Sequence, residues 1–212
     1  MINDITLINY GLGNILSVER AFTKNGANII LTNSKKEIKS ANKIILPGVG
    51  SFGFAISKLK KLNIYDTIIE TVEKGVPILG ICLGMQLLFE KSFEFGNNEG
   101  LKLLNGEVIP IKYKRCKKIK IPNINWLNLN KTKNNQKNNE LISNINFRED
   151  KFYFIHSYLA QPKYSEDILA HSYYEDIKIP AVVNKNNIYG CQFHPEKSGE
   201  AGFTIINNFL KI

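Results

Sequence analysis

The stretch that decides the fold is Gly80-Ile81-Cys82-Leu83-Gly84, which lies between the apolar run Val76-Pro77-Ile78-Leu79 and a helical pattern over residues 85–90. A cysteine flanked by glycines between a strand and a helix predicts a nucleophile on a sharp, crowded turn. The same turn places the sulfur at a helix N-terminus, where the peptide dipole favours thiolate over thiol. Cys82 is therefore the candidate nucleophile, and a buried core cysteine is the alternative reading.

A base and a carboxylate stand near the end of the chain, in His194-Pro195-Glu196. They follow another apolar run, residues 188–193. His194 can act as a general base, and Glu196 can orient its imidazole, which completes a Cys/His/Glu set with Cys82. Taken one at a time, His194 could be a surface loop residue and Glu196 a surface carboxylate. The two motifs together favour catalysis.

Composition predicts one globular domain over residues 1–212. The length suits a single α/β domain with a full core, and no apolar run approaches 20 residues. Met1-Ile2-Asn3-Asp4 carries no export pattern. Cys82, Cys116 and Cys191 are far apart without a C-x-x-C pair, which argues against a disulfide framework or a zinc site. We expect a cytoplasmic protein that binds no membrane, metal or cofactor.

The net charge of +9 is the compositional oddity. It is concentrated in a basic cluster that consists of Lys112, Lys114, Arg115, Lys117, Lys118 and Lys120. Nucleic-acid binding is one interpretation. Only Tyr113 interleaves the cluster, however, and Lys, Asn and Ile are frequent throughout the chain. We therefore expect a solvated basic edge or a docking face for an acidic partner, and no nucleic-acid binding.

Strands and helices alternate in the first half of the chain, which predicts a doubly wound, mostly parallel sheet flanked by helices. The second half is richer in strands and predicts a mixed sheet closed by a C-terminal helix through residues 203–209. Residues 131–139 form a low-complexity loop. The expected strands are 5–8, 28–31, 43–46, 76–81, 106–111, 152–157, 168–172, 181–184 and 188–193, and the expected helices include 34–40, 54–62 and 65–72.

Two turns fall on the carboxyl edge of this sheet, because each follows a strand. One carries Cys82, and the amide of Leu83 after it is a candidate oxyanion donor. The other, Pro47-Gly48-Val49-Gly50, can offer a second donor from Val49 or Gly50, since its glycines let a peptide rotate without a Cβ penalty. A plain strand-ending turn is the alternative for this loop.

These motifs resemble those of the class I, triad-type glutamine amidotransferases. The resemblance rests on Gly80 to Glu90 and on Phe193-His194-Pro195-Glu196-Lys197-Ser198. Three further segments resemble more closely the glutaminase subunits of imidazole glycerol phosphate synthases: Asn9-Tyr10-Gly11-Leu12-Gly13-Asn14, Leu46 to Gly53, and Phe154-Ile155-His156-Ser157-Tyr158. The resemblance implies a flavodoxin-like fold with an antiparallel second half.

The resemblance also implies a function. Glutamine would be hydrolysed to glutamate and ammonia, and the ammonia would pass to a (β/α)8-barrel cyclase in a heterodimer. That partner would make imidazole glycerol phosphate and the aminoimidazole carboxamide ribonucleotide of histidine biosynthesis. His156 on an apolar strand is read as structural. The family pattern assigns glutamine binding to Gly50, Gln86, Glu94, Ser157 and Tyr158, and the partner interface to Asn14, Pro122, Asn123 and Trp126.

The chain departs from the family at the expected interface. Where the family has Pro-His-x-Gly-Trp-Asn, this chain has Pro122-Asn123-Ile124-Asn125-Trp126-Leu127, and Ser51 stands where a histidine is common. A paralogous glutaminase that supplies ammonia for amidating a surface-polysaccharide sugar is therefore an alternative. A cysteine peptidase of similar architecture and a non-catalytic binding subunit are two further alternatives.

Overall fold

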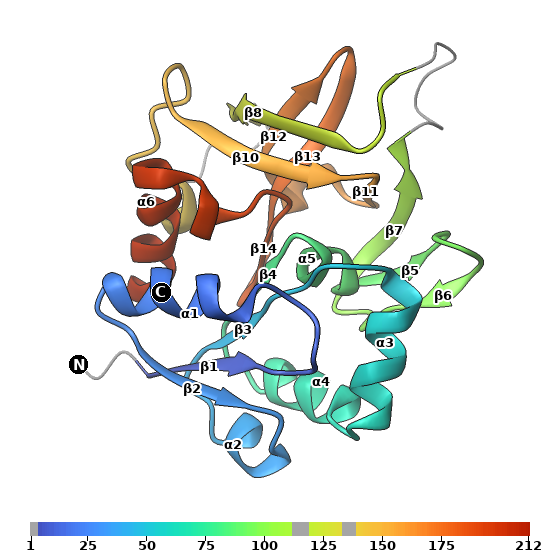
Figure 1. Cartoon of the computed structure of the whole chain (residues 1–212), viewed down its shortest axis with the longest axis vertical. Helices are drawn as coiled ribbons and strands as arrows, with labels where there is room; N and C mark the ends of the chain where they lie inside the picture. The colour runs from blue at the N-terminus through green and yellow to red at the C-terminus, as the bar shows by residue number, and fades with distance from the viewer. Residues whose placement is uncertain (1–3, 112–118, 133–138) are drawn as a thin grey trace.

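The computed structural model describes residues 4–111, 119–132 and 139–212 and is built around an eight-stranded sheet (Figure 1). The strand order is β2-β1-β3-β4-β14-β13-β12-β9. The first five strands are parallel, and the last three join by antiparallel pairings. The strands are β1 (Asp4–Ile8), β2 (Asn28–Thr32), β3 (Ile44–Leu46), β4 (Ile78–Ile81), β9 (Asn130–Lys131), β12 (Ile168–Tyr174), β13 (Ile177–Lys185) and β14 (Ile188–Cys191).

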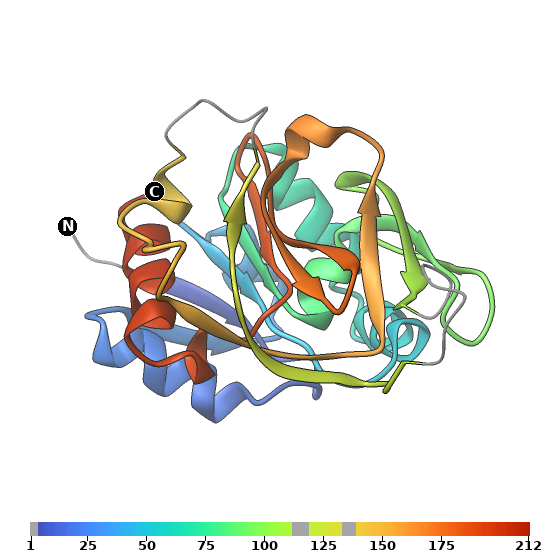
Figure 2. The same ribbon diagram turned by 90° about the horizontal axis from the view of Figure 1, so that it is seen from above.

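Helices cover both faces of the parallel part of the sheet. On one face α1 (Ile15–Lys24) and α6 (Gly199–Lys211) lie side by side (Figures 1 and 2). The other face carries α2 (Lys35–Lys39), α3 (Phe52–Lys61) and α4 (Tyr65–Glu73). Ile45 and Leu79 point into the core beside α1 and α6, while their neighbours Ile44 and Ile78 point into the core beside α2, α3 and α4. Strands buried on both faces have no polar alternation, so the predicted doubly wound sheet is confirmed.

The second half differs from the single mixed sheet that was expected. Residues 106–111 and 152–157 were assigned to it, but β7 (Leu104–Pro110) and β10 (Lys151–His156) belong to two smaller sheets. One has the order β11-β7-β5-β6, with β5 (Phe89–Ser92), β6 (Asn98–Glu99) and β11 (Tyr158–Pro162); the other pairs β10 with β8 (Asn123–Asn128). The physical reason is that β10 packs against the face of β12 and β13 in a shared core and so does not join their edge, while β7 packs in the core beside α3 and α4.

The chain crosses from one core to the other between β10 and β11. Phe152 and Phe154 of β10 pack in the core beside α1 and α6. Ala160 of β11 packs in the core beside α3 and α4. The connection at Ser157 therefore passes over the carboxyl ends of β4 and β14, as Figure 1 shows. It closes the edge of the sheet where the two predicted turns lie.

The helix after Cys82 is shorter than its pattern predicted. We expected residues 85–90 to be helical, but α5 (Leu83–Leu87) ends before Phe89, which starts β5. Phe89 pairs with Leu104 of β7, and the carbonyl of Leu88 accepts hydrogen bonds from the strand-forming segment. The run 87–89 is buried on all sides, so its apolar residues carry no period that separates a helix from a strand.

The described residues also include the 3-10 helices η2 (Glu140–Ile142), η3 (Ser165–Asp167) and η4 (Pro195–Lys197). Most of the basic cluster and of the predicted 131–139 loop lies outside the described residues. Within the described ranges, no helix combines the length and the hydropathy needed to cross a membrane.

The two glycines around Cys82 are required by packing. A Cβ on Gly84 would overlap the carbonyl oxygen of Leu46 at the end of β3. A Cβ on Gly80 would lie 2.7 Å from the Cα of Met85. Neither contact can be relieved by rotating a side chain, because the atoms belong to backbone. The elbow, residues 80–84, therefore needs both glycines so that β4 can turn directly into α5 beside β3.

Replacing Gly84 with alanine tests this packing. Because the new methyl group meets backbone, Gly84→Ala should lower the free energy of unfolding by about 3 kcal/mol, measured by urea titration. Gly26→Ala is the matched control, since Gly26 has φ of +87° but open space around its Cα. The control should lose only about 1 kcal/mol from backbone strain. Equal losses in the two variants would contradict the packing argument.

Candidate active site

Cys82 occupies a strained position between β4 and α5. Its φ is 54° and its ψ is −109°, a conformation that residues with a side chain rarely adopt. The backbone is held there because Cys82 N–H donates to Cys191 O at 2.8 Å and Cys82 O accepts from Gln86 N–H at 3.2 Å. Since α5 has only five residues, single N–H groups near the sulfur contribute more to stabilising a negative charge there than the dipole of the helix does.

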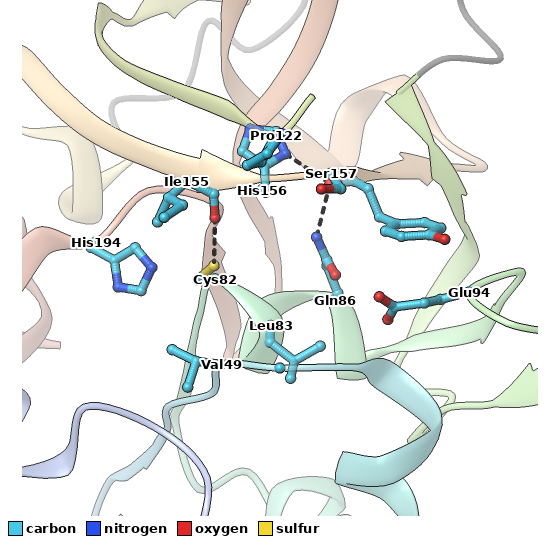
Figure 3. Close-up of a pocket in the computed structure, with 12 residues that line it drawn as sticks. Val49, Cys82, Leu83, Gln86, Glu94, Pro122, Ile155, His156, Ser157 and His194 are labelled. Atoms are coloured by element: carbon cyan, nitrogen blue, oxygen red, sulfur yellow. Dashed lines mark hydrogen bonds between the residues drawn. The ribbon is translucent and has the colours of Figure 1, made fainter. Parts of the chain in front are cut away.

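His194 and Glu196 follow β14 and form a buried pair. The Nδ1–H of His194 donates to Oε1 of Glu196 at 2.7 Å, and the two side chains are 4% and 1% exposed. The backbone of His194 is fixed by its N–H, which donates to Tyr153 O at 2.9 Å, and by its carbonyl, which accepts from Ser198 Oγ at 2.6 Å. The ring then faces Cys82 across the cavity (Figure 3).

The surroundings of His194 favour its protonated form. Burial alone would lower its pKa, but hydrogen bonds with Cys82 and with Glu196 outweigh burial and raise the pKa to about 10. A cationic imidazole beside a sulfur stabilises the thiolate. The arrangement is therefore that of a nucleophile paired with a base whose tautomer and orientation are set by a carboxylate.

A cavity of about 270 Å³ opens beside Cys82. It brings together the nucleophile and base with the predicted oxyanion and glutamine-binding residues, which come from different elements (Figure 3). Glu196 lies behind His194 and does not line it. The lining residues are Val49, Gly50, Cys82, Leu83, Gln86, Glu94, Pro122, Ile155, His156, Ser157, Tyr158 and His194.

Glu94 supplies the acidic end of this cavity. It lies between β5 and β6. Its Oε2 accepts a hydrogen bond from Phe52 N–H at 2.6 Å, at the start of α3. Burial raises the pKa of Glu94, and that hydrogen bond acts in the opposite direction. Its carboxylate points into the cavity (Figure 3).

The predicted oxyanion loop is anchored at Pro47. The hydroxyl of Tyr10 donates to Pro47 O at 2.7 Å, and a Cβ on Gly48 would lie 2.6 Å from that hydroxyl. Beyond this anchor, Val49 is 42% exposed and Gly50 has φ of +100°. The loop therefore has a base fixed by Tyr10 and an exposed tip. The role of Tyr10 in holding this loop was not predicted from the sequence, although its position between the end of β1 and Gly11 places it at the same edge of the sheet.

His156 is structural, as the sequence favoured, but it also lines the cavity. Its Nδ1–H donates to Tyr158 O at 2.7 Å, and its Nε2 accepts from Asn123 Nδ2 at 3.0 Å. Burial is the main cause that lowers its pKa to about 4, so the ring is neutral near pH 7. The neighbouring Ile155 was not anticipated: its carbonyl lies 3.8 Å from Cys82 Sγ and can accept a hydrogen bond from the thiol.

The residues expected at a partner interface fall into two groups. Asn14 is exposed, and Trp126 is 52% exposed with its ring 5.6 Å from that of Tyr153, so Trp126 is not a core residue. Pro122 lines the cavity. Asn123 is 0% exposed, and its amide bonds inward to His156.

The described residues outside the cavity add little chemistry. Cys191 is a buried free cysteine in the core beside α6. Among residues 4–111, 119–132 and 139–212, no three His, Cys, Asp or Glu side chains are grouped so that they could hold a metal ion.

The raised pKa of His194 predicts a pH-dependent stability. The folded chain holds this proton more tightly than an unfolded chain, where the pKa is near 6.5. The resulting stabilisation is complete below pH 6.5 and is lost as the pH rises toward 10. Because Glu196→Gln removes one group that raises this pKa, its deficit in unfolding free energy should be largest near about pH 6 and should shrink by about pH 9.5.

Urea unfolding of the wild-type chain and the variant at both pH values measures this deficit. Glu73→Gln, an exposed carboxylate at the end of α4, is the control and should show no such trend. A deficit of the same size at both pH values would mean that Glu196 acts through packing and not through the charge on His194.

Comparisons with known proteins agree with this geometry. Residues 6–212 match the model of the family described as glutamine amidotransferase class-I. A relative from Lactococcus lactis, named imidazole glycerol phosphate synthase subunit HisH, is 45% identical over 98% of both chains. Relatives of the same name include one from Caldanaerobacter subterraneus, 45% identical over 97% of this chain and 96% of its own, and one, numbered 1, from Legionella pneumophila, 41% identical over 99% and 100%.

Solved structures support the fold. The PurLQS structure from Thermotoga maritima superposes with a TM-score of 0.73 over 100% of this chain and 99% of its own, at 18% identity. A crystal structure titled glutamine amidotransferase gives a TM-score of 0.70 over 98% and 99%, at 15% identity. Together with the family match over nearly the whole sequence, these comparisons show that the chain belongs to the class I glutamine amidotransferases.

Proposed function

We propose that this chain is the glutaminase subunit of an imidazole glycerol phosphate synthase, with residues 1–212 as one catalytic domain. The observation that carries the proposal is the buried arrangement of Cys82, His194 and Glu196 at one cavity that also holds an amide side chain and a carboxylate. The relatives at 41–45% identity carry the name of that synthase subunit, which favours it over the sugar-amidating alternative.

The first half of the reaction forms a thioester. Cys82 gives its proton to Nε2 of His194, which forms the thiolate–imidazolium pair that the raised pKa of His194 favours. The sulfur then bonds to the side-chain amide carbon of glutamine while the carbonyl electrons move to oxygen. The amide of Leu83 and a peptide N–H of the Val49-Gly50 tip stabilise that oxyanion. When the intermediate collapses, the C–N bond breaks and His194 gives its proton to nitrogen. Ammonia leaves.

The second half releases glutamate. His194, now neutral, takes a proton from a water molecule, which adds to the thioester carbon. Collapse of this second oxyanion breaks the C–S bond, and the proton on His194 returns to the sulfur. Glu196 remains ionised throughout and holds the imidazole in place through Nδ1. No cofactor is needed for any of these steps.

The rest of the cavity orients the substrate. Glu94 receives the ammonium group of glutamine at the end opposite His194. Gln86, Ser157 and Tyr158 bind the polar groups of the substrate between its two ends. Gly50, which has no side chain, leaves room for the substrate to approach the loop. Glutamine lies in an extended form with its amide at Cys82.

The ammonia acceptor is on another chain. A (β/α)8-barrel cyclase that converts a nucleotide intermediate to imidazole glycerol phosphate in histidine biosynthesis is the proposed partner. It docks on the exposed face around Trp126, next to Pro122 at the mouth of the cavity. A cytoplasmic location is part of this proposal, since a catalytic thiol must stay reduced.

Glutamate release from glutamine tests the proposal. The assay is run with this chain alone and then with the cyclase encoded by the same genome, loaded with its nucleotide substrate. The loaded complex should release glutamate faster than the chain alone, and Cys82→Ala should abolish release in both. Cys191→Ala is the matched cysteine control and should keep the wild-type rate, because its side chain lies in the core.

Two other outcomes would change the assignment. Glutamate release that ignores the cyclase would keep the glutaminase and reassign the partner. A complex that stays inactive under every condition would return Cys82 to a structural role.

The partner-facing role of Trp126 can be tested separately. An exposed tryptophan beside an aromatic neighbour is a typical binding anchor, so Trp126→Ala should weaken binding to the cyclase by about tenfold to a hundredfold. Leu31→Ala, on β2 at the far edge of the sheet, is the control and should bind normally. Isothermal titration calorimetry measures both affinities, and unchanged binding of the tryptophan variant would place the interface elsewhere.

A further inference from the structure

Gln192 lies directly beside the nucleophile. In the parallel pairing of β14 with β4, Cys191 is opposite Ile81, so the next residue of each strand, Gln192 and Cys82, are neighbours. Gln192 is 0% exposed, and its N–H donates to Ala181 O at 2.9 Å. Its side chain and that of His194, two residues later, both contact Cys82. The sequence analysis gave Gln192 no role.

The orientation of the Gln192 amide follows from its neighbours. The carbonyl of Tyr158 can only accept a hydrogen bond, so the atom of Gln86 that lies 3.0 Å from it must be the nitrogen Nε2. The same Nε2 lies 2.9 Å from Gln192, whose facing atom must then be the oxygen Oε1. The remaining atom of the Gln192 amide is therefore its nitrogen, and this nitrogen faces Cys82.

The Gln192 nitrogen is within hydrogen-bonding range of the sulfur. Nε2 of Gln192 and Sγ of Cys82 are 3.8 Å apart. A neutral thiol can donate to Ile155 O, which is also 3.8 Å away, but a thiolate has no proton to donate. The thiolate depends on groups that donate to it, and among the described residues these include His194 on one side and Gln192 on the other.

We propose that Gln192 is a further catalytic residue, which donates its amide N–H to the Cys82 thiolate while its oxygen holds Gln86 in place for the substrate. The inference rests on the proposed function in taking Cys82 as the nucleophile. It adds a donor that is preorganised, since Tyr158 O and Gln86 prevent the amide from turning over. A hydrogen bond to a charged sulfur is stronger than one to a neutral thiol, so it favours ionisation.

The pH dependence of Cys82 alkylation tests the inference without glutamine or a partner. Free chain is treated with iodoacetamide over a range of pH values, and modification of Cys82 is followed by peptide mass spectrometry to separate it from the other cysteines. Gln192→Met keeps the length of the side chain and removes the donor. We expect the apparent pKa of alkylation to rise by about one unit, so that alkylation near neutral pH falls by about tenfold.

A second variant provides an independent test if the Gln192→Met protein does not fold. Gln192→Glu retains an oxygen for Gln86 but places an acceptor opposite the sulfur, so alkylation near pH 8 should be slower still than in Gln192→Met. Asn208→Leu is the matched control, because it also removes a buried amide, but one that bonds to Leu141 O and Ser143 O. Circular dichroism establishes that each variant is folded.

The outcomes separate this inference from the proposed function. Alkylation profiles of both Gln192 variants that match the wild-type profile would overturn the inference, even if the complex hydrolyses glutamine. A raised alkylation pKa in both variants, with Asn208→Leu unchanged, would support it even if no glutaminase activity is found. In an active complex, Gln192→Met should also lower kcat and raise KM for glutamine. A raised KM with unchanged kcat would mean that Gln192 only holds Gln86 in place, and it would overturn the role at the sulfur.

Discussion

The parallel pairing of β4 with β14 is the constraint on which the rest of the site depends. It sets Cys191 opposite Ile81, and the next residues of the two strands then carry Gln192 and the elbow. His194 follows two positions after Gln192 and also contacts Cys82. Two motifs that are distant in sequence therefore meet because of one strand register. A slip of this register by one residue would turn both motifs away from each other, so the apolar faces that fix it also fix the chemistry.

A second layer of structure completes the cavity from above. The chain leaves β10 in one core and enters β11 in the other, so residues 155–158 must cross the carboxyl edge of the sheet. That crossing presents backbone carbonyls of Ile155 and Tyr158 downward to Cys82 and Gln86. Carbonyl groups only accept, and this restricts which atoms can face them. The orientation of the amide side chains is thus set by backbone that belongs to the smaller sheets.

The sequence predicted the parts of this site that are local and missed those that depend on tertiary contacts. The elbow, with Gly80 and Gly84, follows from steric rules, and His194 with Glu196 follows from the chemistry of a triad. The helix after Cys82 was drawn too long because a strand partner, Leu104, decides where it ends. Asn123 was assigned to the partner interface from the family pattern, and that pattern does not show that its side chain turns inward to His156. No periodic pattern encodes such a choice.

The inward-pointing side chain of Asn123 connects the segment 122–127 to the active site. From Asn123 a series of buried hydrogen bonds passes through His156 to Tyr158 O, and from there through Gln86 and Gln192 to Cys82. Buried polar groups of this kind are stable only when each has a partner, so a change at one end alters which orientations are satisfied along the series. Asn123 stands where the family pattern has histidine, and its amide can donate to His156 while its oxygen accepts from Asn125 at 2.7 Å. Both ends of the Asn123 amide are therefore satisfied inside the protein, and Trp126 lies on the exposed side of the same segment.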